Sequence, residues 1–157
     1  MIFVTVGTQI PFDRLIKILD EVAPALGGEE IIAQTSEKAQ YVPCNFKTVG
    51  FLSPDEFNNI FSRARLVVAH AGMGTIISAL RRAKPIIVFP RKASLGEHRN
   101  EHQLATAAEM RRLGAVAVAY DAEELRHLLT SGLDLTPGSI SPSPSPALID
   151  AIKDFIG

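Results

Sequence analysis

The densest group of chemically capable side chains in this sequence is Glu97-His98-Arg99-Asn100-Glu101-His102-Gln103. Carboxylate, imidazole, guanidinium and amide groups bind sugar hydroxyls, phosphates or metals, and this segment lies where a loop is predicted to enter a helix. His98 and His102 lie one predicted helical turn apart, but they lack an obvious third ligand and do not match the HExxH pattern. The segment therefore favours a polar small-molecule site without a metal over a solvated helix start.

Two glycine-containing turns follow short apolar runs. Gly7-Thr8-Gln9 comes after the run at residues 2–6, and Gly72-Met73-Gly74-Thr75 follows the run at residues 66–69. Glycine lets the backbone approach a ligand closely, and a helix that begins at such a turn offers unpaired N–H groups and partial positive charge. These features suit a diphosphate, although a tight strand-to-helix turn also needs glycine for steric reasons alone. Neither turn is a Walker loop or a complete GxGxxG motif, so ATP hydrolysis and dinucleotide redox chemistry are disfavoured.

Three further polar residues follow predicted strands. Arg91 and Lys92 either add positive charge toward an anionic ligand or belong to a solvated loop. His70 either lines the same site or only hydrogen-bonds a neighbouring carbonyl group. Ligands bind beyond the carboxyl ends of the strands in doubly wound α/β sheets, so all these segments are expected to meet there.

The stretches between these residues predict alternating strands and helices. Apolar, β-branched runs predict strands at residues 2–6, 31–33, 46–50, 66–69, 85–89 and 115–119. Helices are predicted over residues 11–26, from the capping box Ser53-Pro54-Asp55-Glu56, from Gly72 through Leu80, over 98–112 and after Asp121. Strands that are apolar on both faces and alternate with amphipathic helices indicate an α/β fold. The expected architecture is a doubly wound, mostly parallel sheet with helices on both faces.

The domain is predicted to span residues 1–132. Residues 133–146 include TPGSISPSPSP, which is too rich in proline and serine for a regular element and predicts a semi-rigid linker. Residues 147–157 predict a short amphipathic helix, which either docks on a partner or folds back on the domain.

Composition narrows the classes of protein. The chain has 157 residues, 46% of them hydrophobic and 21% charged, with a net charge of -1. It lacks the basic surplus of a general nucleic-acid or anionic-membrane binder. The single cysteine, Cys44, excludes an internal disulfide and a multi-cysteine metal site. The first residues, MIFVTVG, carry no basic segment, and no apolar run approaches about 20 residues, so a cytoplasmic chain without a secretory signal is expected.

Three stretches, taken in order, resemble the nucleotide-sugar-binding C-terminal half of a GT-B glycosyltransferase, specifically glycosyltransferase family 28. They are VTVGTQIPFDRL, VVAHAGMGTIISAL, and KPIIVFPR followed by EHRNEHQLATA, and the resemblance covers roughly residues 1–130. The chain is most similar to the small subunits of two-part enzymes. LGEHRNEHQLATA resembles the bacterial exopolysaccharide and capsule type, called PssE or EpsE, more than the type that completes the second sugar of a dolichol-linked oligosaccharide. The resemblance implies a Rossmann-like fold.

It also implies a donor site assembled from four segments. The first glycine turn lies near the diphosphate and sugar, the second holds the diphosphate, and residues 49–52 hold the uracil. Asn100, His102 and Gln103 meet the sugar hydroxyls, and Glu97 and His98 flank them. Ser78 stands where the family often has a ribose-binding glutamate, so a weaker ribose contact is expected. The expected donor-binding residues are Gly7, Thr8, Gln9, Gly50, Phe51, Gly72, Met73, Gly74, Thr75, Ser78, Arg91, Glu97, Asn100, His102 and Gln103. The general base is unassigned: His70, His98 and His102 are candidates, and a partner chain is another source.

The predicted function is that of the catalytic, UDP-sugar-binding subunit of a two-component inverting glycosyltransferase in exopolysaccharide or capsule biosynthesis. In such an enzyme an acceptor hydroxyl on a lipid-diphosphate-linked sugar attacks the anomeric carbon, and UDP leaves without a metal or other cofactor. The transferred group would be a hexose, a hexuronic acid or an N-acetylhexosamine. A membrane-associated acceptor-binding subunit is the expected partner and would hold the chain at the inner face of the plasma membrane, whereas the isolated chain could pair as a homodimer.

Two other functions stay open. One is a non-catalytic module that binds nucleotide sugars for regulation, and the other is a stand-alone UDP-sugar hydrolase or epimerase. Sugar transfer after addition of the membrane partner would separate the first from the predicted transferase. Rapid consumption of UDP-sugar by the isolated chain would indicate the second.

Overall fold

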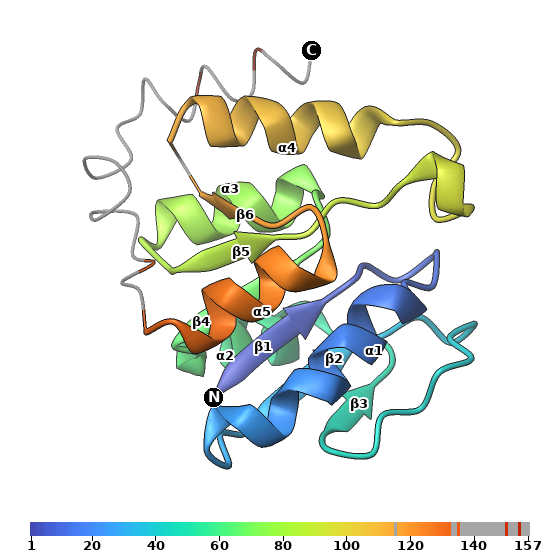
Figure 1. Ribbon diagram of the computed structural model, residues 1–157. Helices are drawn as coiled ribbons and strands as arrows, with labels where there is room; N and C mark the ends of the chain where they lie inside the picture. Colours follow the sequence, from blue (N-terminus) through green and yellow to red (C-terminus); the bar gives the residue numbers. More distant parts are fainter. Residues whose placement is uncertain (115, 133–134, 136–149, 151–153, 155–157) are drawn as a thin grey trace.

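Six parallel strands form the centre of the molecule, in the spatial order β3-β2-β1-β4-β5-β6 (Figure 1). The computed structural model describes residues 1–114, 116–132, 135, 150 and 154. The strands are β1 (Ile2–Thr5), β2 (Ile31–Gln34), β3 (Lys47–Val49), β4 (Leu66–Ala69), β5 (Ile86–Val88) and β6 (Ala117–Val118). The helices are α1 (Asp13–Val22), α2 (Pro54–Arg63), α3 (Met73–Arg81), α4 (His102–Arg112) and α5 (Ala122–Thr130), and 3₁₀ turns cover Ala23–Leu26 and Ala93–Leu95. The predicted doubly wound α/β fold is confirmed.

Strand β1 pairs on both sides, with β2 and with β4. The chain therefore winds outward from β1 in one direction through β2 and β3, and in the other direction from β4 through β5 and β6. This is the strand order in which the crevice for a ligand opens at the carboxyl ends of the two central strands.

The core consists of two apolar layers, one on each face of the sheet. Side chains alternate along β1, so Ile2 and Val4 join the layer under α1 and α5, whereas Phe3 joins the layer under α2, α3 and α4. Figure 1 shows α1 and α5 together in front of the sheet. Because both faces are covered, β1 and β4 are buried along their whole length, as in other parallel sheets.

Helix starts follow the predicted capping signals. The Ser53 side chain accepts a hydrogen bond from the Glu56 N–H, and the Glu56 carboxylate accepts one from the Ser53 N–H. At α5 the Asp121 carboxylate accepts a hydrogen bond from the Glu124 N–H. Both helix starts are confirmed, because a short polar side chain satisfies a backbone donor that has no partner inside the helix.

Two helix boundaries differ from the prediction. The α-helix α1 ends at Val22 and continues only as a 3₁₀ turn, because Pro24 has no N–H to donate to the helical ladder. Helix α4 begins at His102, not His98, because side chains capture the backbone before it. The Asn100 Oδ1 accepts a hydrogen bond from the His102 N–H at 2.9 Å, and such local bonds compete with helix formation.

The polar segment after β2 is ordered by one buried carboxylate that the sequence did not mark. Asp20 accepts hydrogen bonds from the Tyr41 hydroxyl at 2.7 Å and from the N–H groups of Cys44 and Asn45. Burial alone would raise the pKa of Asp20, but these hydrogen bonds lower it below its usual range. One side chain of α1 therefore fixes a loop that has no regular structure of its own.

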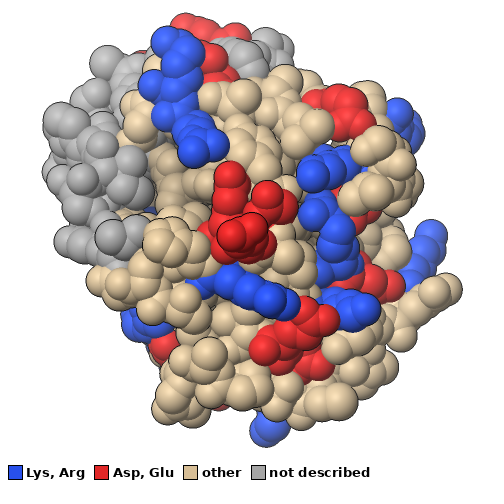
Figure 2. Space-filling view, in the orientation of Figure 1, with Lys and Arg blue, Asp and Glu red and all other residues tan. Residues whose placement is uncertain are grey.

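The predicted linker at 133–146 and the predicted helix at 147–157 lie largely outside the described residues. Basic and acidic side chains are interspersed over the part of the surface that Figure 2 describes, in keeping with the net charge of -1. Every described helix is too short or too polar to cross a lipid bilayer.

Helix α3 ends with a strained residue. Ala83 has a φ of 49° and lies beyond the last helical turn, where its N–H donates to the Leu80 carbonyl and the Lys84 N–H donates to the Ala79 carbonyl. This is a left-handed helix stop, a position that favours glycine.

We expect Ala83→Gly to raise the free energy of unfolding by about 0.5–1 kcal/mol, because it removes the cost of the left-handed backbone. Urea unfolding measures the change. Ala108→Gly on the exposed face of α4 is the matched control and should lower stability by about 1 kcal/mol. A loss of stability in Ala83→Gly would contradict the prediction.

Candidate functional site

The two glycine turns lie side by side where the central strands end. The register of β1 and β4 pairs Thr5 with Ala69, so the two strands end at the same level and the turns that follow them are neighbours. The His70 N–H continues this pairing and donates to the Thr5 carbonyl at 3.3 Å. Gly7 turns the chain away with a φ of 77°, a conformation that other residues rarely adopt.

The His70 ring fills the space between these turns. A Cβ atom on Gly7 would lie 3.5 Å from the ring, and a Cβ atom on Gly72 would lie only 2.3 Å from its Nε2. The Nδ1 lies 3.3 Å from the Thr5 carbonyl, which can only accept, so Nδ1 carries the hydrogen. Burial, together with the charges of Arg91 and His98, lowers the pKa of His70 to about 4, so the ring is neutral near pH 7. Of the two sequence alternatives, the carbonyl contact is present, and the ring also lines a cavity.

Two cavities open on either side of Gly7 and Thr8. The smaller has a volume of about 240 Å³ and the larger about 460 Å³. The smaller is lined by Val6, Gly7, Thr8, Gln9, Ile10, His70, Arg91, His98 and Gln103. The larger is lined by Thr5, Gly7, Thr8, Gln34, Phe51, Leu52, Pro54, Phe57, Asn58, Thr75 and Ser78. Residues from each of the four predicted segments therefore line one or other of these two adjoining cavities, which together we call the groove.

The larger cavity combines an apolar wall with polar groups. Phe51 is 75% exposed and presents its ring at the cavity, while Thr75 and Ser78 line it with hydroxyl groups from α3. An exposed ring beside hydroxyl groups suits a flat, partly polar ligand such as a nucleoside.

Helix α3 directs its amino end at the groove. Its first residue follows Gly72, which has no side chain to accept hydrogen bonds from the first turn, whereas α2 and α5 are capped by Ser53 and Asp121. A Cβ atom on Gly74 would meet no atom within 4 Å. An open helix start with free space above it can bind an anion.

The charged groups of Arg91 and Glu97 turn inward. Arg91 is only 2% exposed, and its guanidinium donates to the backbone carbonyl groups of Ile10 and Pro11, which follow the first glycine turn. The Glu97 carboxylate accepts hydrogen bonds from Arg14 at 2.8 and 2.9 Å and from the Lys92 N–H at 3.0 Å. The alternative of a solvated loop is therefore wrong for Arg91. Both side chains hold the loops of the groove together.

The predicted sugar-binding residues separate into two groups. Gln103 is 7% exposed and lines the smaller cavity, and its Oε1 accepts a hydrogen bond from the Arg91 N–H at 2.9 Å. That bond leaves the amide nitrogen as the free end of the side chain. Asn100 and His102 are exposed at the start of α4. The linings of the two cavities do not include the remaining predicted residues Gly50, Gly72, Met73, Gly74, Glu97, Asn100 and His102.

The histidine pair does not form the geometry of a metal site. His98 precedes α4, so it is not one helical turn from His102. In the part of the chain that the structure describes, no three His, Cys, Asp or Glu side chains gather closely enough to hold a metal ion.

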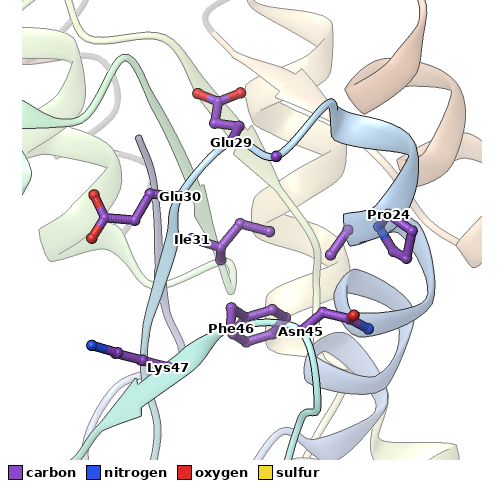
Figure 3. A pocket seen from close by; sticks show the side chains of 9 residues that line it. Pro24, Glu29, Glu30, Ile31, Asn45, Phe46 and Lys47 are labelled. Carbon is purple, nitrogen blue, oxygen red and sulfur yellow. The ribbon is translucent and has the colours of Figure 1, made fainter.

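A cavity of slightly greater volume lies elsewhere, near the amino ends of β2 and β3. It measures about 490 Å³ and is lined in part by Pro24, Glu30, Phe46 and Lys47 (Figure 3). Its other carboxylate, Glu29, is already bound to Arg65 and to the N-terminal amine. None of the predicted site residues lines this cavity, so the groove at the carboxyl ends is the better candidate.

The sheet order and the groove at its switch point define an α/β domain of the doubly wound class. Residues 1–137 match the glycosyltransferase family 28 C-terminal domain, and the chain belongs to this family.

Sequence relatives include UDP-N-acetylglucosamine transferase subunit ALG13 of Yarrowia lipolytica. It is 28% identical over 84% of this chain. The ALG13 subunit of Eremothecium gossypii is 31% identical over 68% of this chain. The chain spans 65% and 51% of these two proteins.

Solved structures share the fold. An NMR solution structure of ALG13 aligns with a TM-score of 0.59 at 24% identity, covering 97% of this chain and 96% of that one. MurG of Acinetobacter baumannii aligns with a TM-score of 0.57 at 18% identity, and the match covers 97% of this chain but 49% of MurG.

The contact between Gly72 and His70 predicts a pair of opposite stability changes. Gly72→Ala should lower the free energy of unfolding by about 1–3 kcal/mol, because the new methyl group must displace a ring that is packed between two loops. Gly74→Ala has open space and a helical position, so it should be neutral or stabilising by up to about 1 kcal/mol. Urea unfolding of both variants measures the difference, and equal effects would contradict it.

The neutral state of His70 predicts a pH-dependent stability. The folded pKa of about 4 lies below the ordinary value of 6.5, so the unfolded chain binds the proton more tightly. This contribution is complete above pH 6.5 and is lost as the pH falls toward 4, by up to about 3 kcal/mol. Urea unfolding of the wild type and of His70→Gln between pH 7 and 5 tests it. The wild type should lose more stability than the variant, and identical slopes would argue against a buried neutral ring.

Proposed function

We propose that this chain is the donor-binding subunit of a two-component inverting glycosyltransferase that uses a UDP-sugar. The observation that supports this most is the groove at the β1–β4 switch point. There an uncapped helix start lies beside a cavity whose lining suits a nucleoside, and a second cavity is lined with polar side chains. The family of the chain and the names of its relatives agree with this reading.

The proposed pose places the diphosphate beside the amino end of α3. The first-turn N–H groups and the space above Gly74 receive the diphosphate, and their partial positive charge stabilises UDP as it leaves. Phe51, Thr75 and Ser78 would hold the nucleoside in the larger cavity. Gln103 and His98 would face the sugar in the smaller one.

In the proposed reaction an acceptor hydroxyl forms the new bond to the anomeric carbon. The bond from that carbon to the diphosphate oxygen breaks, and its electron pair leaves with UDP. His70 is a weak proton acceptor near pH 7, because burial holds its pKa near 4. The hydroxyl proton would therefore go to His98 or to a group on the acceptor side.

A second subunit is part of the proposal because the sequence relatives are named as subunits and because this chain aligns with only part of a longer solved chain, MurG. It covers 49% of the MurG chain to which it aligns. The other half would bind the acceptor, for which we propose a lipid-diphosphate-linked sugar. We also propose that association of this chain with the membrane occurs through that subunit.

The sugar and the pathway rest on different arguments. The relatives reported above are named UDP-N-acetylglucosamine transferase subunits, so N-acetylglucosamine comes first among the proposed donors. The exopolysaccharide or capsule context rests on the PssE- or EpsE-like segment LGEHRNEHQLATA alone and stays a prediction from sequence.

Calorimetric titration with UDP, UDP-N-acetylglucosamine, UDP-glucose and UDP-glucuronic acid, without added metal, tests the proposal. We expect saturable binding, and Gly74→Asp should weaken it by roughly tenfold or more, because a carboxylate would enter the space assigned to the diphosphate. Ala108→Asp, which adds the same charge on the exposed face of α4, is the control and should bind like the wild type.

Three other outcomes would change the conclusion. Binding only after addition of the acceptor subunit would mean that the partner completes the site. Rapid consumption of UDP-sugar by the chain alone would favour a hydrolase or epimerase, and binding without transfer in the presence of the partner would favour a regulatory module. A folded chain that binds no nucleotide under either condition would refute the proposal.

A further inference from the structure

A buried cation lies behind the first glycine turn. Arg91 is 2% exposed, and it follows β5 at the point where the chain enters the loop before α4. Taking a guanidinium out of water is costly unless its N–H groups find partners, so such a residue is held by specific contacts.

Those contacts are carbonyl groups on both sides of the glycine turn. The guanidinium donates to the carbonyl oxygens of Val6, of Ile10 at 2.7 Å and of Pro11 at 2.8 Å. A longer contact of 3.4 Å reaches the Glu97 carbonyl in the facing loop. One planar group therefore closes the base of the Gly7–Gln9 turn and joins it to the loop that leads to α4.

The surroundings hold the guanidinium in its plane. Its central carbon lies 4.7 Å from the centre of the Phe12 ring, and Phe12 is itself buried at the start of α1. Arg14, which lies 4.5 Å from the centre of the Phe89 ring, binds the Glu97 carboxylate. The loop, the helix and the strand are thus joined by two arginines, each of which lies over a phenylalanine ring.

The positive charge of Arg91 is not paired with a carboxylate of its own. Its hydrogen-bond acceptors are neutral carbonyl groups, whereas the nearby Glu97 carboxylate is bonded to Arg14. The two arginines and the glutamate leave one net positive charge beside the smaller cavity. Charges are weakly screened at such depth, so this charge acts on an anion in the groove without contact.

We propose that Arg91 is a positioning residue for donor binding. It holds the Gly7–Gln9 turn in its binding shape and contributes positive charge from behind the turn, while its guanidinium stays on the backbone carbonyl groups and does not touch the donor. This inference rests on the proposed function. Lysine cannot replace it, because one ammonium group cannot reach carbonyl groups that the planar fork reaches through two nitrogens.

The variants Arg91→Lys and Arg91→Met separate geometry from charge. We expect both to weaken UDP binding by roughly tenfold or more, since neither closes the turn. Arg63→Met is the control: it removes a positive charge from an exposed position at the end of α2, away from the predicted site segments, and should bind UDP like the wild type. Circular dichroism and thermal unfolding establish that each variant is folded.

An NMR titration of the His70 ring measures its pKa in each variant. Loss of structure alone would not change that pKa differently in Arg91→Met and Arg91→Lys. His70 lies between Gly7 and Gly72, and the charged groups that face it are Arg91 and His98. Arg91→Met should raise the pKa of His70 from about 4 toward its ordinary value, because one of those charges is gone. Arg91→Lys retains the charge, so it should leave that pKa low while UDP affinity still falls.

A structure of the wild-type chain with UDP decides the question even where a variant does not fold. The Arg91 nitrogens should remain on the Val6 and Ile10 carbonyl groups, farther than about 4 Å from any oxygen of UDP. A direct bond from Arg91 to the diphosphate, or wild-type affinity in Arg91→Lys, would overturn the inference. Absence of UDP binding in the wild type, alone and with the partner subunit, would instead count against the proposed function.

Discussion

The parallel pairing of β1 with β4 is the constraint on which the groove depends. Because the chain winds away from this pair in both directions, the crevice opens where β1 and β4 end, and its two cavities lie on either side of Gly7 and Thr8. The register that sets Thr5 opposite Ala69 also places His70 between Gly7 and Gly72. A shift of one residue would reverse the direction of every side chain on β4 and send the ring to the other face.

Beyond the strands, side chains rather than backbone ladders hold the loops. Arg91 fixes the turn after β1, the Arg14–Glu97 pair fixes the loop after β5, and Asp20 fixes the segment between β2 and β3. Each of these groups is buried or partly buried and bonded to several partners, which offsets the cost of removing its charge from water. The result is a ligand groove whose walls are loops with fixed positions.

The sheet and most helix starts could be predicted because their signals are local. Apolar runs mark buried strands, and pairs such as Ser53 and Glu56 mark a helix start within one turn. The hydrogen-bond partners of Arg91 and Asp20 could not be predicted, because they lie 80 residues and 24 residues away in the chain. The late start of α4 was missed for a related reason: Asn100 favours both a loop and a helix cap, and only the folded loop decides between them.

In the proposed reaction, the residues of this chain are better suited to stabilising the leaving group than to accepting the proton. The leaving-group side of the proposed transfer is complete within this chain: an open helix start, a glycine that admits close approach, and a buried positive charge. The proton-accepting side is less well provided for, because His70, which lies partly buried between the two turns, is held neutral with a pKa near 4. Proton transfer is efficient when the acceptor's pKa lies near the working pH, so in the proposed reaction the base is His98 or a group on the acceptor side rather than His70. A donor-binding subunit that stabilises UDP as it leaves but accepts a proton poorly would also limit hydrolysis of the bound UDP-sugar until an acceptor binds.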